Sequence, residues 1–354
     1  MVSRIFFTGG SNYPSGGGRV LNEVVNLARE RGYDAWLCLP EKHCQLATFV
    51  SNPAPVRAIE GLLGDVTSAD VIVFGWHSAE EYELLQSAQA RLKVFWQHGN
   101  LIPVGPGLVA EKMLQSSQVD QYWNVSTECA LFITEKYGIE NFRIVPPFFE
   151  EYTSIFSLPL PWHMREGILV QQRRGFELFP IIERIADQER VPVTVLKWPF
   201  HNDELLEALN CHKFFISFDR GLRYNPTLGR RKQHFMRTMS SGGSLREALS
   251  AKPTWVKQEQ NLLGFPISAA QAARQGAVVI GFAMGGGLEW MSPQTTYLAQ
   301  DGSGIDLGRK LRAALRDSES NHQAKRKAAL SAVKKFSAEN TWAQIESALG
   351  LRGG

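Results

Sequence analysis

The stretch "NLLGFPISAAQAARQGAVVIGFAMGGGLEW" (residues 261–290) holds the pattern that decides the fold. A Gly-Phe-Pro tripeptide at 264–266 leads into an apolar segment of helical spacing, and Gly276 is placed to end that helix. The apolar run 278–282 then predicts a buried strand, and three glycines precede Glu289. A helix, a buried strand and a glycine turn in direct succession are typical of α/β folds.

The same alternation of strands and helices fills the first half of the chain. Apolar runs predict buried strands at 4–10, 34–40, 70–76, 93–99 and 121–126, and the stretch 142–148 ends this block with a proline pair. Helical spacing lies between them at 19–32, 79–91 and 127–137. Parallel strands need crossover connections, which are usually helical, so this order favours a parallel, doubly wound sheet.

The alternation restarts after an irregular segment with three prolines, which we interpret as a hinge at 151–166. In the second half, strands are expected at 167–172, 193–198, 213–218, 277–283 and 295–300, and helices at 177–188, 203–210, 268–275 and 306–318. The tail then reads as two helices that part near Phe336, with Ser337 or Asn340 as the cap of the last one.

These patterns predict an α/β protein of two Rossmann-like, doubly wound domains that face a cleft. The first domain is expected at 1–150, and the second at 167–335 with a basic insert at 220–260. A last helix at 336–354 is expected to pack back on the first domain. Ligands of open parallel sheets bind outside the carboxyl ends of the strands, so the cleft is the predicted site.

The composition is that of an ordinary soluble protein, with 354 residues, 44% of them hydrophobic and 21% charged. No apolar run approaches the length of a membrane span, and the N-terminal apolar run meets glycines too early for a secretory signal. We therefore expect a cytoplasmic protein, with peripheral attachment to a membrane surface as an open alternative. The four cysteines show no CxxC spacing, which favours buried thiols over a metal site or disulfides.

The positive charge of the chain is local. The whole sequence carries a net charge of +3, whereas residues 220–257 hold nine Lys and Arg against the single acid Glu247. Such a concentration of positive charge indicates an anionic partner, and the alternative is a solvated loop.

Two features of the first half could contact a ligand. Gly17 and Gly18 stand between the first strand and the first helix, where glycines let a backbone approach a phosphate or a sugar. His98 follows a predicted strand, where an imidazole can exchange a hydrogen bond or a proton with a substrate hydroxyl. A flexible loop tip and a structural histidine are the alternatives.

In the second half, cations follow two neighbouring predicted strands. Arg173 and Arg174 come directly after the strand at 167–172, and Lys197 ends the next one. Guanidinium groups there would neutralise a diphosphate, since their fork geometry suits two oxygens at once. A solvated basic turn is the alternative.

Taken in order, these motifs resemble the GT-B glycosyltransferases of the large retaining family 4. The stretch at 261–290 is similar to the signature of their second domain, and "RRGFELFPIIERI" at 173–185 resembles their Arg and Lys-Gly phosphate grip, with Arg174 in place of the lysine. "GGGRVLNEVVNLARERGYDAWLCLP" at 16–40 looks like their N-terminal glycine turn and first helix. The likeness covers most of the chain.

The resemblance implies transfer of a sugar from a nucleotide-diphosphate donor, held by the second domain, to a glycosyl acceptor bound by the first. The expected catalytic residues are Arg174, from this resemblance, and His98, from its place after a predicted strand. The donor-binding residues that follow from the motifs together with the resemblance are Gly17, Gly18, Arg173, Arg174, Lys197, Gly264, Phe265, Gln271, Gly286, Gly287 and Glu289.

The sequence departs from the family at its two motif glutamates, which fall on Leu263 and Gln271. The amide of Gln271 can still bond a ribose hydroxyl, whereas Leu263 cannot replace a carboxylate that touches the donor sugar. In retaining GT-B enzymes the leaving diphosphate is thought to help deprotonate the acceptor, so a missing protein base does not exclude turnover. Stabilisation of the departing diphosphate would then supply the larger share of the rate.

The basic insert is the second departure, and we expect Arg230, Arg231 and Lys232 to bind the glycosyl acceptor or another anion. A glycan, a lipid-linked phosphate and nucleic acid are all open as the partner.

The sequence therefore favours a retaining glycosyltransferase that uses a nucleotide sugar as substrate and no cofactor or metal, since no DxD ends a predicted strand. The alternatives are a catalytically degenerate GT-B protein that binds a nucleotide sugar or glycan, and a nucleic-acid-associated GT-B protein.

Overall fold

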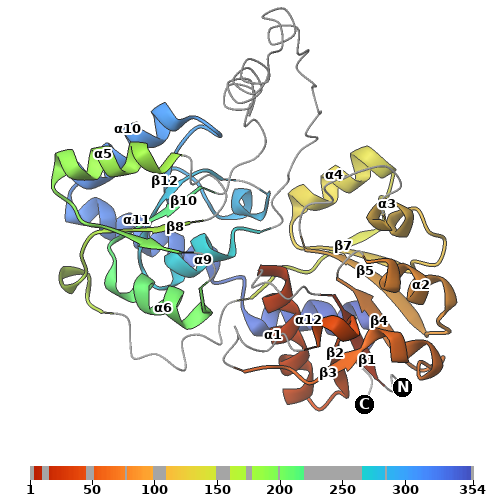
Figure 1. The fold of residues 1–354 in the computed structure, drawn as a ribbon. Helices are drawn as coiled ribbons and strands as arrows, with labels where there is room; N and C mark the ends of the chain where they lie inside the picture. The colour runs from red at the N-terminus through yellow and green to blue at the C-terminus, as the bar shows by residue number, and fades with distance from the viewer. Residues whose placement is uncertain are drawn as a thin grey trace, which may run out of the picture.

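A computed structural model gives two lobes, each built on one parallel sheet with helices on both faces (Figure 1). The structure describes residues 4–9, 16–44, 52–75, 78–98, 109–148, 160–172, 178–197, 200–218, 265–283 and 285–351. The α/β class predicted from the alternation of strands and helices is confirmed.

The first lobe contains a seven-stranded sheet in the order β3-β2-β1-β4-β5-β6-β7, with every pairing parallel. Its strands are β1 (Ile5–Thr8), β2 (Ala35–Leu39), β3 (Val56–Ala58), β4 (Val71–Phe74), β5 (Leu92–Gln97), β6 (Gln121–Asn124) and β7 (Phe142–Ile144). Its helices are α1 (Gly16–Glu30), α2 (Ala79–Ser87), α3 (Val109–Leu114) and α4 (Thr127–Tyr137), with short 3-10 turns η1 (Glu41–His43) and η3 (Ile59–Gly64).

The second lobe contains a five-stranded parallel sheet in the order β12-β11-β10-β8-β9. Its strands are β8 (Ile168–Gln171), β9 (Val193–Leu196), β10 (Phe214–Ser217), β11 (Val278–Gly281) and β12 (Tyr297–Leu298). Its helices are α5 (Phe179–Glu189), α6 (Asn202–Cys211), α9 (Ile267–Arg274), α10 (Gly304–Arg316) and α11 (Glu319–Val333), with 3-10 turns η5 (Trp162–Met164) and η7 (Gly285–Glu289).

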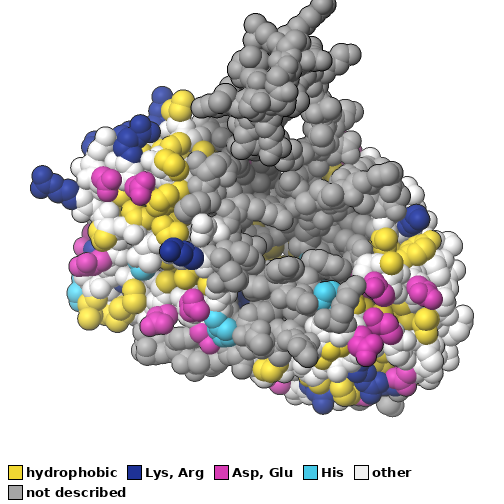
Figure 2. Space-filling model, in the orientation of Figure 1, with side chains coloured by type: hydrophobic (Ala, Val, Ile, Leu, Met, Phe, Trp, Pro, Cys, Tyr) yellow, Lys and Arg dark blue, Asp and Glu magenta, His cyan; other side chains and the backbone are white. Residues whose placement is uncertain are grey.

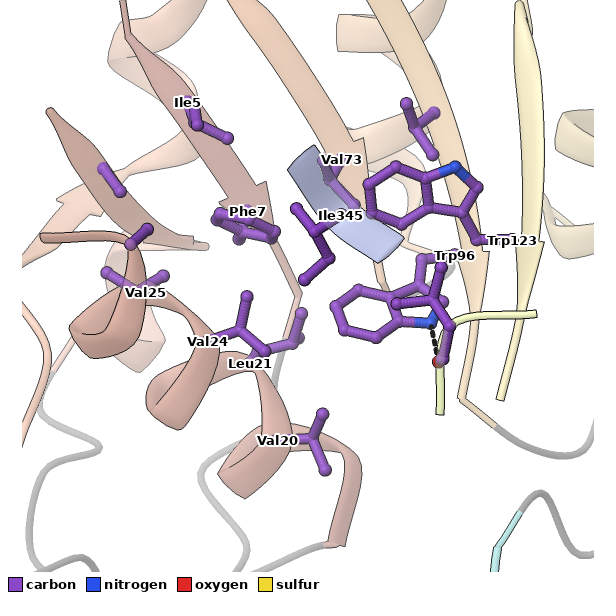
Figure 3. Close-up of a cluster of buried hydrophobic side chains, with 14 of the residues drawn as sticks. Ile5, Phe7, Val20, Leu21, Val24, Val25, Val73, Trp96, Trp123 and Ile345 are labelled. Atoms are coloured by element: carbon purple, nitrogen blue, oxygen red, sulfur yellow. Dashed lines mark hydrogen bonds between the residues drawn. The ribbon is translucent and has the colours of Figure 1, made fainter. Parts of the chain in front are cut away.

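The last helix, α12 (Ala338–Leu349), leaves the second lobe and lies beside α1 on the first sheet (Figure 1). Trp342 and Ile345 belong to the same buried cluster as Phe7 and Trp96, and Figure 3 shows Ile345 between them. The Thr341 hydroxyl donates to the carbonyl of Pro146 at 3.0 Å. One face of the first sheet is therefore covered by helices that are far apart in the sequence.

Strand alternation divides each sheet into two cores. In the first lobe, Phe7 and Trp96 face α1 and α12, while Phe6 and Phe95 face a second cluster under α2 and α3. In the second lobe one cluster lies under α5 and α10, and the other under α6, α9 and α11. Because both faces of each sheet are buried, the strands read as continuous apolar runs rather than alternating ones.

Several boundaries differ from those expected. The helix predicted at 79–91 ends at Ser87, because the chain must turn before Leu92 to enter β5. The edge strand β3 and the short helix α3 give no periodic signal long enough to predict them. The predicted cap of the last helix is confirmed at Ser337, whose hydroxyl accepts from the Asn340 amide at 3.2 Å.

Candidate functional site

The carboxyl edges of the two sheets face each other. The segments that follow the strands of one sheet contact those of the other, at the start of α1, at the start of α4, at the starts of α6 and α9, and at η7. Phe265 and Ile267, at the start of α9, pack against buried clusters of both lobes. This junction of the two lobes therefore lies where ligands of open parallel sheets bind.

The N-terminus of α1 lies directly at this junction. A Cβ on Gly16 would come within 2.9 Å of the Ile267 side chain, and one on Gly17 would lie 3.4 Å from the Cβ of His98. His98 follows β5, is half-buried, and its ring packs on Trp96 with centroids 4.2 Å apart. The first turn of α1 carries no acidic residue. The free backbone amides of a helix N-terminus favour binding of an anion, so this end of α1 is suited to one.

A buried arginine crosses from this helix to the second lobe. The Nη1 of Arg19 donates to the Oδ1 of Asn202 at 2.7 Å, and its Nε donates to Glu23 at 2.6 Å. All three residues are buried. Asn202 is the first residue of α6, which follows the edge strand β9, so this bond joins the carboxyl edges of the two sheets.

Glu289 makes a second bridge between the lobes. Its Oε1 accepts from the backbone amide of Thr127, the first residue of α4, at 2.8 Å. Its Oε2 lies 3.8 Å from the Nζ of Lys335, just before α12. A carboxylate at a helix N-terminus is stabilised by the helix dipole, so this contact favours the observed arrangement of the lobes.

The glycine turn is shaped by close packing. A Cβ on Gly286 would lie 2.2 Å from the ring of Phe265, and one on Gly287 would lie 3.1 Å from Pro266. Phe265 in turn meets Phe336 edge-on with ring centroids 4.7 Å apart. Both glycines thus allow the chain after β11 to lie on the segment that begins α9.

Gln271 is a buried polar side chain that the packing of α9 leaves without a hydrogen bond to the described residues. It lies on α9 and is 2% exposed, and within the described part of the chain neither atom of its amide has a hydrogen-bond partner. The Oγ of Ser217 and the Nε2 of Gln171, which end β10 and β8, are also buried without a partner among these residues. Buried polar atoms nearly always form a hydrogen bond, so we expect a ligand or another group to supply a partner for each of these atoms.

These three side chains lie on one side of the second sheet. Leu169 and Phe215 belong to the core under α9, and residues two positions further along a strand face the same way. Gln171 and Ser217 therefore face α9, which carries Gln271. A ligand with hydroxyl or amide groups at this edge would supply the missing hydrogen bonds.

The other predicted site residues fall into two groups. Lys197 directly follows β9 and has an exposed side chain, and Gly18 lies in the first turn of α1. The remainder lie outside the described residues, namely Arg173, Arg174, Arg230, Arg231, Lys232, Leu263 and Gly264.

Sequence reasoning missed the residues that join the lobes. Arg19, Asn202 and Thr127 each lie in the first turn of a helix that follows a strand, a position they share with the predicted ligand residues. That shared position was the available signal, since such turns gather at one edge of a parallel sheet.

The described residues form neither a cluster of metal ligands nor a helix that could span a membrane. They contain no group of three or more His, Cys, Asp or Glu side chains that could hold a metal ion. None of the helices in those ranges is long and apolar enough to cross a bilayer. The expectation that no metal takes part in the reaction stays a prediction.

Comparison with known proteins gives matches at the level of structure. No protein-family model and no curated protein matches the sequence. The chain is similar to a point mutant of S. aureus TarM, solved with fondaparinux, alpha-GlcNAc-glycerol and UDP, at a TM-score of 0.66 and 7% identity over 98% of this chain and 99% of that one. The chain is also similar to Anabaena Alr3699/HepE, solved with UDP and glucose. The TM-score is 0.62 and the sequence identity 13%, over 99% of this chain and 100% of that one.

A third similar structure is an alpha-glucosyltransferase in complex with UDP and a 13-mer DNA containing a HMU base. Its TM-score is 0.62 at 9% identity, over 99% of both chains. Since the likenesses extend over both lobes, the chain has the GT-B fold of two Rossmann-like domains. At such identities they show the fold alone.

Proposed function

We propose that this protein is a glycosyltransferase that moves a sugar from a nucleotide-diphosphate donor to a glycosyl acceptor, with retention and without a metal. The observation that carries the proposal is a group of buried polar atoms at the carboxyl edge of the second sheet that have no hydrogen-bond partner among the described residues, namely Nε2 of Gln171, Oγ of Ser217 and both amide atoms of Gln271. That edge faces the N-terminus of α1 on the first lobe. The GT-B fold, which the chain shares with the UDP complexes above, supports the same reading.

The donor is assigned to the second lobe. A ribose has two hydroxyls that can pair with the donor and the acceptor of the Gln271 amide, which its position in the family pattern also favours. The diphosphate would lie toward the α1 N-terminus and Arg19, where the helix dipole and a guanidinium favour negative charge. Arg173, Arg174 and Lys197 are the further cations proposed for this charge.

On this proposal, catalysis depends mainly on stabilising the negative charge of the departing nucleoside diphosphate. Departure of a nucleoside diphosphate leaves negative charge that fixed amides and cations stabilise without reorganisation. His98, between Trp96 and Gly17, is the side chain proposed to contact the hydroxyl of the glycosyl acceptor. Glu289 is engaged with Thr127 and Lys335, so we assign it to holding the lobes together.

The first experiment measures donor binding through thermal stability. UDP, GDP, ADP and dTDP and their sugars are compared, and UDP is expected to give the largest shift because it is the nucleotide in the similar structures. A ligand at 100 times its Kd adds about 2.7 kcal/mol to the free energy of unfolding. No shift with any of these nucleotides would contradict the proposal.

The matched variants are Gln271→Leu and Gln271→Glu. Leucine cannot pair with a hydroxyl, so nucleotide affinity should fall by about tenfold to a hundredfold, the cost of about 1–3 kcal/mol for one lost polar partner. Glutamate accepts hydrogen bonds from a ribose and should keep most of the affinity. If Gln271→Leu and the unchanged protein bind the nucleotide with equal affinity, Gln271 does not contact the nucleotide.

Turnover is tested separately from binding. Labelled nucleotide sugar is incubated with the protein, and both transferred and hydrolysed sugar are counted. Binding without either product would favour the alternative, a GT-B protein that holds a nucleotide sugar without transferring it.

A further inference from the structure

The helix α10 of the second lobe is basic. Residues 304–316, which form α10, contain four Lys and Arg against the single acid Asp306. Residues 151–335 as a whole contain 26 Lys and Arg against 17 acids, whereas residues 1–150 contain eleven against sixteen. Figure 2 shows dark blue side chains beside yellow ones at the upper end of the second lobe, where Figure 1 draws α5 and α10. The two lobes therefore differ in charge, and the positive end of the molecule includes α10.

The exposed side of α10 carries a row of cations that ends in an isoleucine. Leu307, Leu311 and Ala314 face the core, which leaves Ile305 and Arg309 on the outer side with Arg316 further along. Ile305 is 75% exposed, more than the other large hydrophobic side chains of the described residues. We call Ile305, Arg309, Arg312 and Arg316 the α10 ridge, and we add to it the half-buried Lys310, which lies on the flank of α10 near Lys325.

The apolar end of the α10 ridge continues onto α5. A Cβ on Gly304 would lie 2.7 Å from Ile181 and 3.1 Å from Leu178, so the residue before Ile305 touches the start of α5. Leu178 and Phe179 are half-buried there, and Pro180 is exposed. An apolar corner thus lies at the end of a basic helix, at the carboxyl edge of the sheet.

The charges of the α10 ridge are only partly neutralised. Arg312 donates to Gln188 at 2.8 Å, and Arg316 pairs with Glu189. Arg309 and Lys310 have no hydrogen-bond or ion-pair partner among the described residues. Burial lowers the pKa of Lys325 on α11, Asp317 opposes this effect, and Lys310 adds a smaller repulsion.

We infer that the α10 ridge is a docking surface for an anionic lipid bilayer. Lys and Arg around an exposed aliphatic side chain are what an interfacial helix offers to acidic headgroups and the acyl boundary below them. A duplex nucleic acid would use the cations but gain nothing from Ile305, since its backbone offers phosphates. The Ile305 end of the α10 ridge lies at the carboxyl edge of the second sheet, the edge that faces the first lobe, so docking would hold this edge near a membrane-bound acceptor.

The test is co-sedimentation of the whole protein with vesicles of phosphatidylcholine alone and of phosphatidylcholine mixed with phosphatidylglycerol. We expect binding to the mixed vesicles that weakens with salt, and little to the neutral ones. Arg309→Glu with Lys310→Glu should weaken it by about tenfold or more, at about 1 kcal/mol for each cation near the surface. Ile305→Ser should also weaken it.

The controls are Lys112→Glu and Leu63→Ser, which change an exposed lysine and an exposed leucine of the first lobe. Both should bind vesicles as the unchanged protein does, and all variants should keep its thermal midpoint. The inference is overturned if the mixed vesicles do not bind, or if the ridge variants bind them as the controls do. It is also overturned if a DNA duplex competes fully with the vesicles and its own binding is unaffected by Ile305→Ser.

Discussion

Gly286 lies under the ring of Phe265, where a side chain has no room. A Cβ there would come 2.2 Å from the ring, and the ring is held from its other side by Phe336. Gly286→Ala should therefore lower the free energy of unfolding by about 1–3 kcal/mol, as overpacking of a core does. Chemical denaturation measures the change.

The control for this prediction is Gly61→Ala. Gly61 is exposed in η3, and a Cβ there would meet nothing within 4 Å. The free energy of unfolding of the Gly61→Ala variant should differ from that of the unchanged protein by less than about 0.5 kcal/mol. If both variants unfold at the same denaturant concentration, the contact between Gly286 and Phe265 is not as close as described.

At the residue scale the sequence predicted the position of site residues better than their partners. The glycine turn and Gln271 could be placed from spacing, because both follow from the order of a helix and a strand. The bond from Thr127 to Glu289 joins residues 162 positions apart, and no local pattern encodes such a contact. The bond of Glu289 to α4 could therefore not be predicted, and its expected contact with the donor stays a prediction.

The first strand is fixed at its start by an ion-pair cluster. The guanidinium of Arg4 donates to Asp70 at 2.7 Å and to Asp65 at 2.8 Å. Burial alone would raise the pKa of Asp70, but the hydrogen bonds from Arg4 and Thr67 outweigh burial and lower it. The hydrogen bond from Arg4 likewise lowers the pKa of Asp65.

This cluster predicts how stability depends on pH. A carboxyl group with a lowered folded-state pKa stabilises the protein above its unfolded pKa, about 4, and that contribution is lost as pH falls through the folded value. Arg4→Met should therefore destabilise the protein most at neutral pH, and the difference from the unchanged protein should shrink below about pH 4. Denaturant titrations over this range measure it.

The matched control is Arg29→Met. Arg29 pairs with Asp34 at 3.6 Å, and both side chains are more than two-fifths exposed, so this pair should contribute less than about 1 kcal/mol at any pH. A difference between Arg4→Met and the unchanged protein that stays constant with pH would contradict the role assigned to the cluster.

At the element scale the long helices and the central strands could be predicted, and the short pieces could not. Strands such as β1, β4 and β10 are fully buried and read as apolar runs. The edge strand β3 is half-buried over three residues, and β12 has two. Elements this short are set by what they pack against, so a window along the chain gives little signal.

The whole molecule depends on α12 to complete the first lobe. Trp342 is 1% exposed and meets Tyr33 with ring centroids 5.4 Å apart. Trp342→Ala should cost about 3–5 kcal/mol, as the loss of a buried tryptophan does. Hydrogen exchange should then show faster exchange in β1, β5 and β6, with β8 and β10 changed much less.

Leu330→Ala serves as the control, because Leu330 lies on α11 of the second lobe and is 47% exposed. It should leave exchange in both sheets unchanged. Equal loss of protection in both sheets after Trp342→Ala would mean that the lobes unfold as one unit.

At this scale the fold class was predictable because repeated strand and helix patterns restrict the topology to a few arrangements. The strand order and the contact faces of the lobes were not, since they depend on pairs such as Arg19 with Asn202, 183 residues apart.

The position of α12 also sets an order of events during synthesis. Thr341, which bonds the carbonyl of Pro146, leaves the ribosome 195 residues after it. Throughout that interval the apolar surface around Phe7 and Trp96 is not yet covered by α12. The lobe that is made first is thus the one whose folding must finish last, and a growing chain exposes that surface to chaperones while the second lobe is still being made.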